Sequence, residues 1–111
     1  MPRVIPPRPL TVADLRGIGA CPGGIWRFTA SFGDSTLVAP SRDWMGAAYR
    51  SHLWSSDFGW AAGRLLPHDW SSIYFTVTQE AFDRLPCFDH DAGRRIRIAV
   101  FATLYAHHGA P

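Results

Sequence analysis

The chain has 111 residues, of which 47% are hydrophobic and 18% are charged, and its formal net charge is +2 at pH 7. This balance excludes an intrinsically disordered chain, and the length allows one compact domain with little room for a second. No apolar run reaches the roughly 18 residues that a membrane helix needs. Two cysteines, Cys21 and Cys87, are too few for a disulfide scaffold. We therefore expect a reduced, cytoplasmic protein without a membrane segment.

The first third of the chain carries signals for an extended arm and two helices. Residues 1–9 contain four prolines and two arginines, which predicts an extended arm. Thr11, followed three residues later by an aspartate, predicts a capped short helix that ends near Gly19. Pro22 suits the first position of a second helix, whose apolar residues recur at spacings of three and four until Gly33.

The middle of the chain predicts two further helices after a short connector. Residues 34–40 form the connector, part of which could be briefly extended. Ser41 is a typical cap for the next helix. Ser55 or Ser56 begins another helix, which Pro67 closes.

The segment 69–77 is ambiguous between helix and strand. Its apolar residues Ile73, Phe75 and Val77 alternate as in a strand. Because one strand without a partner is a poor fit to the rest of the chain, we expect a helix or an irregular segment here. Thr78 is then expected to cap a short helix that Pro86 ends.

The last helix is expected over about residues 92–107, with Asp89 or Asp91 as its cap. It is apolar on most of its sides, which predicts a central helix contacted by several neighbours. The fold class is therefore all-α: a single domain of five to six short helices over residues 10–111, preceded by the arm.

No motif predicts a metal site, a cofactor or an enzyme. Cys87, Asp89, His90 and Asp91 form the densest polar cluster, but a zinc site usually has a second ligand pair at a set spacing. The two aspartates fit a helix cap better, and Cys87 fits a small buried residue; whether the four bind a metal stays open. The chain has neither a Gly-x-Ser-x-Gly elbow nor a glycine-rich phosphate loop, and its single glutamate, Glu80, weighs against paired acid–base carboxylates.

Arg94, Arg95 and Arg97 are the most informative charges, because cations in the first turns of a helix oppose its dipole. One interpretation is that they pair with nearby aspartates on the face opposite the core. The other is that they anchor an acidic partner or a phosphate backbone. We expect at least one to point to solvent, and reversal of Arg94 and Arg95 to glutamate to leave folding intact.

The five tryptophans are many for a domain of this size. Trp54 and Trp70 fall outside the apolar stripes of the predicted helices. Exposed tryptophan and arginine are enriched in interface hot spots, so these two residues are candidate partner contacts. The alternative is that they cover the core from its edges.

Part of the chain resembles small uncharacterised phage and mobile-element proteins, in which a Gly-Ala-Cys step joins a short helix to an aromatic-striped one. The matching residues are Leu15-Arg-Gly-Ile-Gly-Ala-Cys21, Gly24-Ile25, Phe28, Phe32-Gly33, Asp43-Trp44 and Trp60-Ala-Ala-Gly-Arg-Leu-Leu66. The resemblance covers about residues 10 to 66 and includes no catalytic residue. Since Cys21 closes the tight step between two helices, we expect its thiol to be buried and unreactive.

The resemblance implies a mobile-element origin, and hence a small binding protein or an inhibitor of host defence such as an anti-CRISPR. The preferred prediction is stoichiometric binding to a host protein complex, for example a CRISPR effector, in the host cytoplasm. The alternative is an accessory nucleic-acid-binding protein that uses Arg94, Arg95 and Arg97. The sequence does not predict an oligomeric state.

Overall fold

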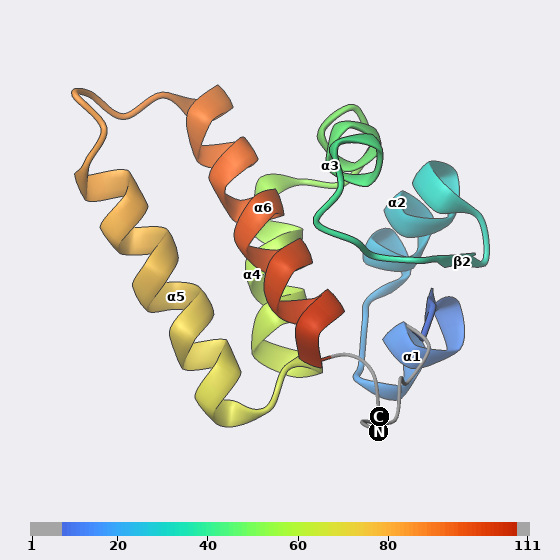
Figure 1. Ribbon diagram of the computed structural model, residues 1–111. Coiled ribbons are helices and arrows are strands. Elements are labelled where there is room, and N and C mark those ends of the chain that lie inside the picture. The colour runs from blue at the N-terminus through green and yellow to red at the C-terminus, as the bar shows by residue number, and fades with distance from the viewer. Residues whose placement is uncertain (1–7, 109–111) are drawn as a thin grey trace, which may run out of the picture.

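Six helices and one short strand pair make up the fold in the computed structural model, which describes residues 8–108 (Figure 1). The helices are α1 (Val12–Gly17), α2 (Pro22–Phe32), α3 (Arg42–Tyr49), α4 (Ser55–Leu65), α5 (His68–Asp83) and α6 (His90–His108). Strands β1 (Leu10–Thr11) and β2 (Ser35–Thr36) pair antiparallel, with Leu10 opposite Thr36. The all-α prediction is confirmed. Most of the predicted arm, residues 1–7, lies outside the described residues.

The helix ends follow local capping chemistry. The Thr11 hydroxyl accepts a hydrogen bond from the Asp14 amide at 3.1 Å, and the Asp14 carboxylate accepts one from the Thr11 amide at 3.0 Å. Ser41 caps α3 through the Trp44 amide, and Asp89 accepts from the Asp91 amide just before α6. These side chains satisfy backbone donors that have no partner inside the helix.

Helix α5 runs without a break from His68 to Asp83, so the predicted cap at Thr78 is wrong. Its buried residues are Tyr74 and Thr78, four apart and therefore on one face. The alternating apolar residues that suggested a strand are all exposed: Ile73 by 43%, Phe75 by 52% and Val77 by 41%. The segment 69–77 is therefore helical. Its alternating apolar residues lie on the two flanks of α5, on either side of the buried face.

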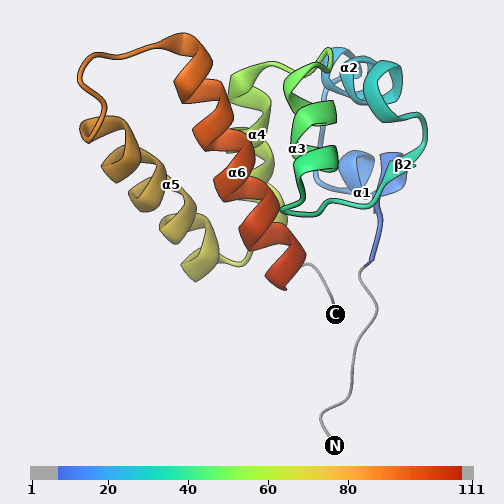
Figure 2. The same ribbon diagram turned by 45° about the horizontal axis from the view of Figure 1, so that its top comes forward.

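Helix α6 is the centre of the fold, as predicted. It contacts α3, α4 and α5, and Figures 1 and 2 show it between α5 on one side and α3 on the other, with α4 behind. Four of its residues are buried in the core: Ile98, Phe101, Ala102 and Tyr105. Helices α1 and α2 and the strand pair form the other end of the molecule, where Leu10, Val12, Leu15 and Phe28 extend the core.

Candidate functional site

A groove of about 330 Å³ lies where the start of α2 meets the start of α4. It is lined by Gly19, Ala20, Cys21, Gly24, Arg27, Trp54, Ser56, Asp57 and Trp60, and we call it the tryptophan groove. Two helix N-termini position these side chains, because Cys21 directly precedes α2 and Trp54 directly precedes α4. The groove therefore lies between α2, at the N-terminal end of the molecule, and α4.

An ion pair between Arg27 and Asp57 lies at the base of this groove. Arg27 Nε donates to Asp57 Oδ2 at 2.9 Å, and Arg27 Nη2 donates to Asp57 Oδ1 at 2.8 Å. The side chains are only 13% and 21% exposed, so solvent screens this bidentate pair less than an ordinary surface pair. The hydrogen bonds that Arg27 donates to Asp57 raise the pKa of the Arg27 guanidinium above its usual value. The pair connects α2 to α4 across 30 residues of sequence.

The same ion pair holds Trp54 in place. Asp57 Oδ2 also accepts a hydrogen bond from the Trp54 amide at 2.7 Å, which fixes the backbone at the start of α4. The Arg27 Cζ atom lies 3.7 Å from the centroid of the Trp54 ring, a close cation–π contact. The Trp54 residue nevertheless remains 60% exposed. Trp54 is therefore exposed, while its backbone amide and its ring both contact the ion pair.

The other tryptophans differ in exposure: Trp70 is half-buried, whereas Trp26 and Trp60 are exposed. Trp70 packs half-buried against the core, with its ring centroid 5.5 Å from that of His107, which fits the alternative that it covers the core from its edge. Residue 70 faces the core because it precedes Tyr74 by one helical turn of α5. Trp26 and Trp60 are exposed instead, and sequence reasoning missed both. Trp26 lies outside the stripe formed by Ile25, Phe28 and Phe32, which was the available signal.

Arg94 is a structural residue of the fold. Its Nε donates to the Tyr49 carbonyl at 3.0 Å and its Nη2 to the Ala48 carbonyl at 3.1 Å, so the guanidinium caps the C-terminus of α3. Burial lowers the pKa of this guanidinium from its usual value. The expectation that Arg94 can be reversed without cost to the fold is therefore revised, because the C-terminal carbonyls of α3 require its donors.

Arg95 and Arg97 point to different neighbours. Arg95 Nε donates to Asp91 Oδ2 at 3.1 Å, and Asp91 also accepts a hydrogen bond from the Tyr49 hydroxyl. The Arg97 Cζ atom lies 4.8 Å from the centroid of the Phe82 ring. Of the predicted cluster, Arg95 is the exposed member. The three arginines therefore do not share one binding surface.

Cys21 is exposed, so the prediction of a buried thiol is wrong. Its Sγ atom accepts a hydrogen bond from the Gly24 amide at 3.4 Å, which makes Cys21 the cap of α2. A capping side chain turns back toward the helix end and away from the core, and this explains the exposure. Cys87, expected to be buried, is also exposed in the loop before α6.

Among residues 8–108, no three side chains of the metal-ligating types come together. Cys87, Asp89, His90 and Asp91 follow one another along an exposed loop and the first turn of α6. In the same residues, no helix combines the length and apolar character needed to cross a membrane.

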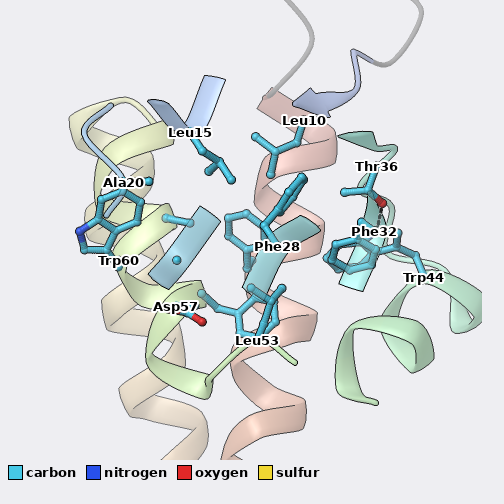
Figure 3. Close-up of a pocket in the computed structure, with 14 residues that line it drawn as sticks. Leu10, Leu15, Ala20, Phe28, Phe32, Thr36, Trp44, Leu53, Asp57 and Trp60 are labelled. Carbon is cyan, nitrogen blue, oxygen red and sulfur yellow. Dashed lines mark hydrogen bonds between the residues drawn. The ribbon is translucent and has the colours of Figure 1, made fainter. Parts of the chain in front are cut away.

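A second pocket, of about 60 Å³, lies next to the tryptophan groove, between the N-terminal elements and α4 and α6, and shares Ala20, Gly24, Asp57 and Trp60 with that groove (Figure 3). Its walls are almost entirely apolar and include Leu15, Phe28 and Phe101. Trp44 closes one side, where its Nε1 donates to the Thr36 hydroxyl at 2.9 Å. A volume of this size is far below the roughly 300–1,000 Å³ of ligand pockets.

Comparison with known proteins found no relative of this chain. No protein family matches the chain, and neither a curated protein nor a solved structure has a significant match to it.

Proposed function

We propose that the protein acts by stoichiometric binding of a protein partner through the tryptophan groove, with Trp54 as the main anchor. The observation that carries this proposal is that Trp54 is 60% exposed while Arg27 contacts its ring and Asp57 bonds to its amide. A large aromatic side chain that is already ordered loses little conformational entropy on binding. Tryptophan and arginine are also the residue types most enriched in interface hot spots.

The finer proposal is that the partner belongs to a host defence complex, such as a CRISPR effector, and that binding inhibits it. This part rests on the resemblance of residues 10 to 66 to phage and mobile-element proteins. The proposal includes no catalytic residue. The nucleic-acid alternative has weaker support, because Arg94 is engaged by the carbonyls of α3 and Arg97 lies over Phe82.

The test is affinity capture with tagged wild-type protein, Trp54→Ala and the matched control Leu37→Ala. Leu37 is 49% exposed and does not line the tryptophan groove. The lysate comes from a host that carries CRISPR effectors, and the bound proteins are identified by mass. We expect one complex in a fixed ratio with wild type and Leu37→Ala, and at least about tenfold less with Trp54→Ala, as a hot spot requires. Circular dichroism confirms that each variant is folded.

Equal capture by wild type and Trp54→Ala would refute the role of the groove. Purified protein that binds DNA or RNA tightly without a protein partner would support the alternative. In that case, binding should weaken steeply with salt, since log K falls by about 0.9 for each phosphate neutralised on duplex DNA.

A further inference from the structure

A second and larger groove, of about 730 Å³, runs between α3 and α6 on a part of the surface that the tryptophan groove does not include. Arg42, Arg50 and Arg95 line it. We call it the arginine groove. Met45, Ile98 and Ala99 contribute apolar side chains to the same lining.

Two of the three arginines have unused hydrogen-bond donors. Arg42 and Arg50 are exposed, and neither forms an ion pair or a side-chain hydrogen bond with any residue from 8 to 108. Arg42 is the first residue of α3 and Arg50 directly follows the helix, so their Cα atoms lie about 12 Å apart along the helix axis. Each guanidinium carries five N–H donors in a planar fork that matches a carboxylate.

Arg95 presents donors from the opposite wall. Only its Nε bonds to Asp91, and its Cζ atom lies 4.2 Å from the centroid of the Tyr49 ring, which orients the side chain. Both oxygens of Asp91 already accept hydrogen bonds, one from Arg95 and one from the Tyr49 hydroxyl. Among the described residues that line the groove, Asp43 is the one carboxylate against three arginines, so the lining is net positive.

Gly46 shapes the α3 wall of this groove. A Cβ atom at residue 46 would lie 3.1 Å from Arg50 Nη1 and 3.5 Å from Nη2. The absence of a side chain therefore lets the Arg50 guanidinium lie against the helix, between Arg42 and the C-terminus of α3. This placement brings Arg50 onto the groove that Arg95 lines from α6.

We propose that the arginine groove binds an acidic segment of a protein, with carboxylates accepting hydrogen bonds from Arg42, Arg50 and Arg95. The inference deepens the proposed function and rests on it for the identity of the partner, since this segment would be a second contact of the same protein. An acidic peptide fits better than a nucleic acid because the groove is partly apolar. Met45 and Ala99 line it beside the arginines, so the side chains of a peptide can pack there, whereas a nucleic acid binds mainly through its row of phosphates.

Fluorescence anisotropy with defined probes tests the proposal without the natural partner. The probes are a ten-residue glutamate peptide, a ten-residue glutamine peptide and a ten-nucleotide single-stranded DNA, at low ionic strength where exposed charges are least screened. The test variant is Arg42→Gln with Arg50→Gln. The control is Arg16→Gln with Arg84→Gln, which removes the same charge from exposed arginines outside the groove.

We expect the glutamate peptide to bind and the glutamine peptide not to bind. The test variant should weaken glutamate-peptide binding at least about tenfold, while the control variant and Trp54→Ala bind it as wild type does. Three results would overturn the proposal: no binding of the glutamate peptide, equal loss in both arginine pairs, or tighter binding of the DNA probe. Because the peptide assay does not depend on Trp54, its failure is distinguishable from failure of the proposed function.

Discussion

Replacing Arg94 by methionine should destabilise the fold measurably. The guanidinium donates to the Tyr49 carbonyl at 3.0 Å and to the Ala48 carbonyl at 3.1 Å, with longer contacts to Ser51 and Ser55. Hydrogen bonds from a charged donor contribute about 1.5–3 kcal/mol each when they are shielded from water. Since Arg94 is only partly buried, we expect about 2–3 kcal/mol in total for the two short bonds and the cation at the end of α3.

The assay is urea unfolding followed by circular dichroism, combined with thermal melting. For a domain of this size, a loss of 2–3 kcal/mol corresponds to a fall in Tm of about 8–12 °C. Arg95→Met is the matched control, because its exposed pair with Asp91 should contribute less than about 1 kcal/mol. Arg94→Lys should recover part of the loss, since lysine keeps the charge and lacks the planar fork. If Arg94→Met unfolds within about 0.5 kcal/mol of wild type, the capping role is refuted.

Two further predictions concern the buried Tyr74 hydroxyl and the exposed Cys21 thiol. Burial raises the pKa of Tyr74 from 10.0 to about 12, so the folded state holds this proton more tightly than the unfolded state, and stability is lost as the pH rises from about 10 to about 12. Tyr74→Phe should reduce this loss in urea titrations at about pH 8 and about pH 11, and an equal loss in both proteins would contradict the reasoning. In a Cys87→Ala background, Cys21 should react with a thiol reagent as fast in the native protein as in urea. Cys21→Ser should change stability by less than about 0.5 kcal/mol, because serine is a good helix cap; slow native labelling would show that the thiol is shielded.

Local features of the fold were predictable because their causes lie within a few residues. The cap at Thr11 and the helices after Ser41 and Asp89 depend on side chains that bond to amides two or three residues away. The central place of α6 follows from its apolar residues on most sides. Trp54 is exposed, which fits one of its two interpretations from the sequence, because it precedes the apolar stripe of its helix.

The remaining features depend on residues far apart in the sequence. Arg94 looks like a free cation in sequence because its acceptor, the Tyr49 carbonyl, is 45 residues away. The Arg27–Asp57 pair spans 30 residues and was not predicted. The alternating apolar residues of α5 suggested a strand because a helix at the edge of the fold exposes apolar residues on both of its flanks. Cys21 was misplaced because a Gly-Ala-Cys step does not indicate whether the thiol turns inward or toward the helix amides.

The position of α6 has a consequence for the order in which the protein folds during synthesis. Helices α3, α4 and α5 each pack on α6, and the last turn of α3 receives its cap from Arg94. During translation, these three helices emerge from the ribosome before the helix that covers their apolar faces. They cannot complete a common core until α6 has also emerged, so their folding is delayed until that point. The first two helices and the strand pair involve only residues before Arg42, so this end of the molecule can begin to form earlier.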